Sequence, residues 1–126
     1  MHNLARILIG TAGALMTAGG LYDAFAPRLP RNLASICGSQ AEVSKLVREL
    51  LRALGGALVS VGAAVVCLAM AARSGFSSGQ LALVVVLTLP AEGMNAFAMR
   101  KVGSPWQFPA IFVALALAGV LLALVP

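Results

Sequence analysis

The chain alternates between long apolar stretches and polar connections. The apolar stretches cover about residues 4–24, 51–72, 81–99 and 106–125, and most of their side chains are apolar or small. Each stretch approaches the ~20 residues that a helix needs to cross a bilayer. One soluble core in a chain of 126 residues is too small to bury all of them. The pattern therefore predicts an all-α fold, an integral membrane four-helix bundle that forms a single domain.

The connections predict how these helices are joined. Short polar turns separate the last three stretches, so neighbouring helices should form an antiparallel, up-down bundle. The first stretch should end before Pro27, because proline cannot continue a helix. Residues 27–50 form the long connection, which we expect to be a polar loop or an interfacial helix that runs into the second span. Within it, Ser39 and Glu42 match a capping box.

Composition supports a membrane location. Of all residues, 60% are hydrophobic and 10% are charged, whereas a soluble domain has about 25% charged residues. Nine Lys and Arg residues outnumber four Asp and Glu residues, but they lie between the apolar stretches and form no basic patch interleaved with aromatic residues. We therefore expect membrane lipids as partners and no nucleic acid.

The distribution of basic residues predicts an orientation. Arg6 and Arg73 belong to one side of the predicted bundle. The other side, formed by the first and third connections, carries seven basic residues: Arg28, Arg31, Lys45, Arg48, Arg52, Arg100 and Lys101. Lys and Arg are enriched in cytoplasmic loops. We expect a multi-pass protein of the cytoplasmic (inner) membrane, with the first and third connections in the cytoplasm and both termini on the opposite side.

Small residues suggest where the helices approach one another. They recur at every fourth position in three spans: Gly10, Ala14 and Ala18; Gly56, Ser60 and Ala64; Ala110, Ala114 and Ala118. Such stripes allow close helix packing in lipid. They fit contacts within the bundle, within a homo-oligomer or within a larger membrane complex.

Glu92 is the most informative position, because it interrupts the third apolar stretch about eight residues, or ~12 Å, before Arg100. An unpaired carboxylate at that depth costs several kcal/mol, so Glu92 should be protonated, paired or directed into a polar interior. Asn95 lies on the same helical face, and Pro90 must loosen the backbone nearby. Glu92 and Asn95 can form a polar notch that carries a proton or a cation. The structural alternative is an ion pair with an arginine of the second span, Arg48 or Arg52.

A second candidate cluster opens the second span. Arg48 and Arg52 are one helical turn apart, with Glu49 between them, so the arginines can clamp a lipid phosphate or an anionic ligand. The alternative is a pair of ordinary interfacial arginines. Asp23 closes the first span on the same side. We expect these residues to converge at the cytoplasmic mouth of the bundle, with Glu92 one layer deeper.

Enzyme motifs do not occur in this sequence. His2 is the only histidine and lies in the N-terminal segment. No set of histidines and carboxylates has metal-ligand spacing, no Ser, His and Asp set is within reach, and no glycine-rich phosphate loop precedes a polar helix. We therefore expect no metal and no cofactor, and the sequence favours a protein that is not an enzyme.

Two segments resemble the DoxX-like family of small four-helix bacterial membrane proteins. The first is Gly20-Leu21-Tyr22 followed by Phe25-Ala26-Pro27. The second is residues 49–56, Glu-Leu-Leu-Arg-Ala-Leu-Gly-Gly. The resemblance implies a four-helix bundle in a bacterial inner membrane, in some members a membrane subunit of quinone-linked redox systems. It supplies no catalytic residues.

Three functional hypotheses follow. The first is a non-catalytic membrane subunit or assembly factor that packs through the small-residue stripes. The second is a proton-coupled or small-ligand carrier that uses Glu92. The third is a membrane enzyme, or a quinone or lipid site, that uses Arg48, Glu49 and Arg52. A polar cavity at Glu92 would favour the carrier, whereas an arginine paired with Glu92 would favour the subunit.

Overall fold

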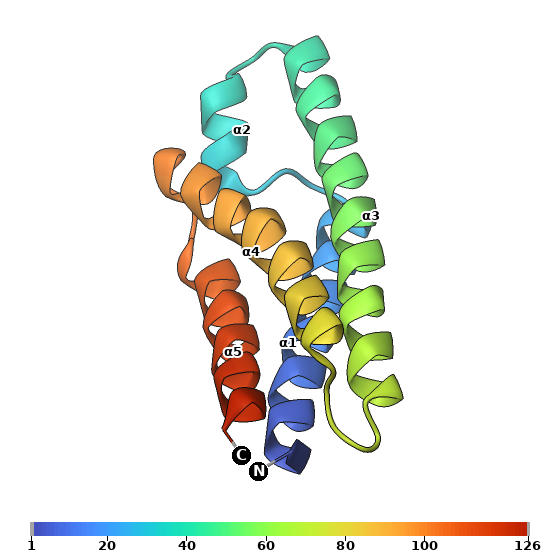
Figure 1. Ribbon diagram of the computed structural model, residues 1–126. Helices are drawn as coiled ribbons and strands as arrows, with labels where there is room; N and C mark the ends of the chain where they lie inside the picture. Colours follow the sequence, from blue (N-terminus) through green and yellow to red (C-terminus); the bar gives the residue numbers. More distant parts are fainter. Residues whose placement is uncertain (1, 126) are drawn as a thin grey trace.

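The computed structural model describes residues 2–125, and this part of the chain is helical with no strands (Figure 1). Its long helices are α1 (His2–Phe25), α3 (Ala41–Ala71), α4 (Ser78–Lys101) and α5 (Gln107–Leu124), and the short α2 (Arg31–Cys37) connects α1 to α3. Each long helix is sufficiently long and apolar to cross a membrane. The all-α prediction is confirmed, and the long apolar helices are compatible with a membrane bundle.

The long helices pack around a common apolar core. Helix α1 packs mainly against α3 and also against α5, while α4 packs against α5 and α3. Figure 1 shows both termini at one end of the molecule, with α2 and the α4–α5 turn at the other. The core contains Ile9, Ala12, Val65, Ala69, Leu81, Val84, Ala116 and Val120. These residues come from all the long helices, so the core ties them together.

Glycines allow α1 and α3 to approach closely. A methyl group at Gly13 would lie 2.8 Å from the carbonyl oxygen of Gly62, and one at Gly20 would lie 2.6 Å from that of Gly55. Both distances are shorter than a van der Waals contact, so the two backbones need glycine at these positions. We call these four residues the glycine seam.

The glycine seam corrects the small-residue stripes expected from the sequence. Ala14 and Ala18 are exposed, and a methyl group at Gly56 would meet nothing within 4 Å. The contact positions of the seam are one or two residues away from the nearest expected ones in both helices. Because α1 and α3 are rich in glycine and alanine, small residues recur on more than one face, and spacing alone does not select the contact face.

Helix α3 extends well before the expected span. Its 31 residues give a length of about 46 Å at 1.5 Å per residue, which exceeds the ~30 Å hydrocarbon core of a bilayer. The capping box expected at Ser39 is wrong, because the N-cap is Gln40 and its side chain makes no capping hydrogen bond. A capping box occurs instead at α4, where Ser77 and Gln80 bond reciprocally at 2.9 and 3.2 Å.

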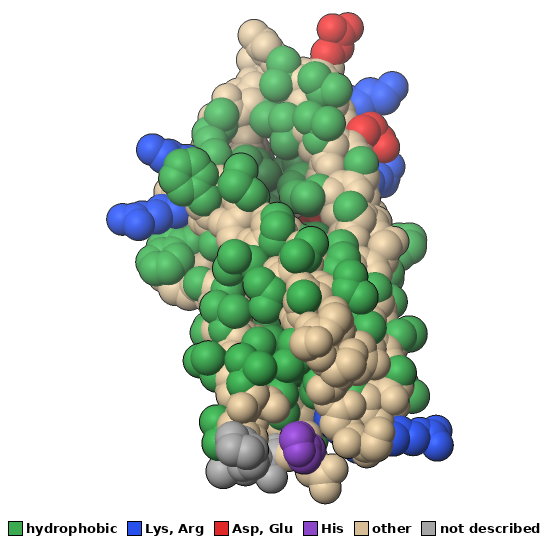
Figure 2. Space-filling model, viewed as in Figure 1, with side chains coloured by type: hydrophobic (Ala, Val, Ile, Leu, Met, Phe, Trp, Pro, Cys, Tyr) green, Lys and Arg blue, Asp and Glu red, His purple; other side chains and the backbone are tan. Residues whose placement is uncertain are grey.

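Charged side chains are distributed unevenly along the molecule. Figure 2 shows them in the upper part and at the lower end of this face, while hydrophobic side chains cover much of the band between them. Many large apolar residues are exposed, including Leu83, Val86 and Leu121 at 50%, 65% and 65%. An apolar band on the outside of a helical bundle suits contact with lipid.

Candidate functional site

A cavity of about 570 Å³ lies between α1, α4 and α5, within the roughly 300–1,000 Å³ typical of small-ligand pockets. Its polar lining residues are Asp23 and Glu92, Asn32 and Asn95, Ser104, and Tyr22. Its apolar lining comes mainly from Leu15, Met16, Leu58, Met99, Phe108 and Phe112. We call it the carboxyl cavity. No Lys, Arg or His lines it.

The buried face of α4 directs Glu92 into this cavity. Leu81, Val84, Thr88 and Glu92 are the buried residues of the helix and follow helical spacing. Thr88 satisfies its hydroxyl locally by donating to the carbonyl oxygen of Val84 at 2.7 Å. Glu92 follows one turn later and lines the cavity. The residue is only 1% exposed.

Asn95 supports Glu92 from the same helix. Its Nδ2 donates a hydrogen bond to Glu92 Oε2 at 3.3 Å. The ion pair expected with Arg48 or Arg52 does not form: within residues 2–125 the sole ion pair joins Glu49 to Arg52. Glu92 therefore faces a cavity with an amide as its partner, which is the polar notch predicted from sequence.

Asp23 contributes a second carboxyl group from α1. It lies in the last turn of that helix and is half-buried. Met16 lines the same cavity two turns earlier, so the cavity extends about 10 Å along α1. Asp23 occupies the end near α2. The sequence prediction that Asp23 and Glu92 lie at one site agrees with this geometry.

Asn32 ties α2 to the α4–α5 turn beside the cavity. Its Nδ2 donates to the carbonyl oxygen of Gly103 at 3.1 Å and to Ser104 Oγ at 3.0 Å. Gly103 has a φ of +69°, a conformation that glycine adopts without strain. Both Asn32 and Ser104 line the cavity. Sequence reasoning missed them, because nothing local in a polar connection indicates a partner about 70 positions away.

The aromatic lining residues also reach the outer surface. Tyr22 from α1 is 71% exposed and Phe108 from α5 is 61% exposed, and both line the cavity. These two rings therefore connect the lining of the cavity with the outer surface of the molecule.

The second candidate cluster does not join this site. Glu49 and Arg52 bond to each other at 2.9 Å on α3, with about half of each side chain exposed. Arg48 is half-buried, and its Nε has no hydrogen-bond partner among the described residues. None of the three lines the carboxyl cavity. The expected convergence is therefore partial, since the structure brings together only Asp23, Glu92 and Asn95.

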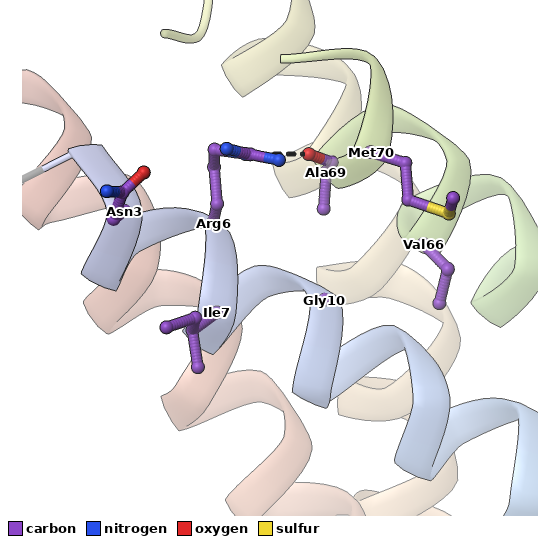
Figure 3. A pocket seen from close by; sticks show the side chains of 7 residues that line it. All are labelled: Asn3, Arg6, Ile7, Gly10, Val66, Ala69 and Met70. Carbon is purple, nitrogen blue, oxygen red and sulfur yellow. Dashed lines mark hydrogen bonds between the residues drawn. The ribbon is translucent and has the colours of Figure 1, made fainter. Parts of the chain in front are cut away.

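A second hollow, of about 430 Å³, lies between α1 and α3 near the N-terminus. Figure 3 shows Arg6 extending from α1 toward the last turn of α3. Arg6 Nε donates to the carbonyl oxygen of Ala69 at 3.2 Å, one of the last carbonyl groups of that helix. A positive charge is favourable there, because it complements the helix dipole. Arg6 therefore has a structural role.

Comparison with protein-family models, with curated proteins and with solved structures finds no match for this chain. The site must be judged on its own chemistry. Within residues 2–125, no three His, Cys, Asp or Glu side chains gather as a metal site requires. What the carboxyl cavity offers is two carboxyl groups and two amides in apolar surroundings, which can bind a small polar or charged group or exchange a proton.

Proposed function

We propose that this chain is a multi-pass membrane carrier that exchanges a proton at Glu92 and binds a small ligand in the carboxyl cavity, with Glu92 as the principal binding group. The observation that carries the proposal is a buried carboxyl group facing a cavity of about 570 Å³, with an amide as its partner in place of an arginine. A carboxyl group in a membrane interior is costly unless it performs a function or is paired.

The proposal includes a topology. The long helices cross the membrane in an up-down arrangement, consistent with both termini lying at one end of Figure 1. The seven basic residues of the first and third connections favour a cytoplasmic location for the opposite end, which carries α2 and the α4–α5 turn. The resemblance to DoxX-like proteins points to a bacterial inner membrane. In this topology Asp23 lies near the cytoplasmic surface.

The carrier is favoured over the two other hypotheses by the surroundings of the candidate residues. In a non-catalytic subunit, Glu92 would serve only to stabilise the bundle through an ion pair. Such an ion pair requires a charged partner in contact with Glu92. A phosphate or quinone site at Arg48, Glu49 and Arg52 requires a shared pocket, but Arg52 is engaged by Glu49 on an exposed face. Neither requirement matches the geometry as well as a ligand cavity does.

Access to the cavity can be tested without knowing the ligand. Dicyclohexylcarbodiimide is apolar and adds covalently to carboxyl groups that it reaches in apolar surroundings. In membranes containing the full chain, we expect it to modify Glu92, detected by peptide mass spectrometry. Glu49, which is exposed and ion-paired, is the matched control and should react far less. Equal modification of the two residues, or no modification of Glu92, would contradict an open cavity.

Carrier activity requires a second measurement. Purified protein in liposomes with a trapped pH-sensitive dye should move protons under an imposed membrane potential, and Glu92→Gln should abolish that movement. Glu49→Gln should leave it unchanged. Equal flux in wild type and Glu92→Gln would remove the carrier function and leave the non-catalytic subunit as the better hypothesis.

A further inference from the structure

The polar atoms of the carboxyl cavity are mainly hydrogen-bond acceptors. Asn95 directs its amide nitrogen to Glu92, and Asn32 directs its amide nitrogen to the α4–α5 turn. The amide oxygens of both residues remain, together with the carboxyl groups of Asp23 and Glu92. Among the described residues, Asp23 receives no hydrogen bond. A ligand that satisfies this site must therefore supply donors.

In the described part of the chain, the protein supplies no basic residue that would compensate a negative charge at this site. No basic residue lines the cavity. The two nearest along α4 are engaged with aromatic rings elsewhere: Arg100 lies 5.7 Å from the ring centre of Trp106, and Lys101 lies 5.4 Å from that of Phe97. An ionised carboxyl group in low dielectric is costly when unpaired, so a ligand that brings a positive charge would bind most favourably.

The rest of the lining suits an apolar body. Phe108 and Phe112 from α5 and Tyr22 from α1 line the cavity. Aromatic faces attract ammonium groups by cation–π interaction and pack against hydrocarbon. A strongly hydrated inorganic cation would lose its hydration shell among such side chains, whereas an organic cation with an apolar body can pack against them.

We propose that the ligand is an amphipathic organic cation, an ammonium group on an apolar body. The ammonium group donates to the carboxyl groups of Glu92 and Asp23, and the body lies against the aromatic rings and the other apolar side chains of the lining. This assignment rests on the proposed function, because it requires the carboxyl cavity to be a ligand site.

Three matched probes separate charge from shape: 4-phenylbutylammonium, the neutral 4-phenylbutan-1-ol and the anionic 5-phenylpentanoate. Binding is measured by calorimetric titration of the full chain in lipid nanodiscs, with empty nanodiscs as the correction for partitioning. We expect the ammonium compound to bind at least about tenfold more tightly than the alcohol, and the anion to bind least.

Single substitutions test which carboxyl group binds the ammonium group of the probe. Glu92→Gln should weaken binding of the ammonium compound by about tenfold or more, which corresponds to about 1.4 kcal/mol, while leaving binding of the alcohol unchanged. Asp23→Asn should weaken it less, because Asp23 is only half-buried, and it provides an independent test if Glu92→Gln does not fold. Glu49→Gln is the control for removing a carboxylate outside the cavity and should have no effect.

The outcomes separate the two proposals. Equal binding of the ammonium compound and the alcohol would overturn the cation assignment and leave a ligand cavity in place. The cation assignment also fails if no probe binds while dicyclohexylcarbodiimide still modifies Glu92. If Glu92 is neither modified nor required for proton movement, the proposed function itself fails.

Discussion

Helix α1 has two sides that differ sharply in packing. Toward α3, the glycine seam leaves no space for a methyl group, since one at Gly62 would lie 2.6 Å from the carbonyl oxygen of Gly13. Toward α4 and α5, the same helix borders a cavity of about 570 Å³. A densely packed interface holds its elements rigidly. The seam can therefore keep α1 in place while its other side borders the cavity between Leu15 and Asp23.

This difference assigns stability and ligand binding to different residues. The seam consists of backbone contacts that carry no chemistry. The cavity contains Asp23 and Glu92, whose burial contributes little to packing and costs desolvation. Residues at ligand sites are commonly less than optimal for stability. Variants on the two sides should therefore separate folding from binding.

The largest expected effect on stability comes from Gly62→Ala. The new methyl group would lie 2.5 Å from Thr17 Oγ1 and 2.6 Å from the backbone nitrogen of Thr17, so α1 and α3 must separate. Overpacking of this kind costs about 1–3 kcal/mol, measured as a lower midpoint of thermal unfolding in detergent. Gly56→Ala is the control in the same helix, since its methyl group meets nothing within 4 Å. Equal losses in both variants would mean that the glycine seam does not exist.

Glu92→Gln should affect ligand binding and leave the stability of the fold intact, the opposite of Gly62→Ala. Glutamine retains an oxygen that can accept from Asn95, and it removes the cost of a buried ionised group. The free energy of unfolding should stay the same or rise by up to about 1 kcal/mol, while binding of the ammonium compound weakens about tenfold or more. A marked loss of stability, measured in the same unfolding assay, would show that Glu92 is structural and would weaken the contrast between the two sides of α1.

A smaller effect is expected at the cavity end held by Asn32. Asn32→Ala removes hydrogen bonds to Gly103 and Ser104, each worth about 0.5–1.5 kcal/mol. We expect a modest loss of stability and faster ligand dissociation, because α2 is no longer tied to the α4–α5 turn. Ser35→Ala is the control, since Ser35 bonds only locally, to the carbonyl oxygen of Asn32 at 2.8 Å. Unchanged dissociation in Asn32→Ala would show that this end does not restrict the ligand.

The elements predicted from local pattern agree best with the structure. The long apolar stretches are helices, and α1 ends at Phe25, just before Pro27. Glu92 is buried beside Asn95, as helical spacing predicts. These features depend on residues within a few positions of one another, which is the range over which helix periodicity and proline act.

Predictions that required knowledge of other helices agreed less well. The small-residue stripes predicted the contact between α1 and α3 only in part: Gly10 faces Ala69 of α3, but Gly56 faces open space. Arg48, Glu49 and Arg52 were expected at the mouth of the site and instead lie apart from it on α3. Asn32 was not recognised, although it joins two distant turns. In each case the deciding contact is between residues far apart in the sequence.

The sequence by itself determined that residues 2–125 contain long apolar helices and that one of them carries a carboxyl group where an apolar residue would be expected. Only the tertiary structure decided what that carboxyl group faces. The reason is physical: the period of a helix places Glu92 on the inner face of α4, but the packing of α1 against α3 and α5 determines whether that face meets an arginine, a tight core or a cavity. It meets the carboxyl cavity, and Glu92 is therefore the residue at which function should be tested first.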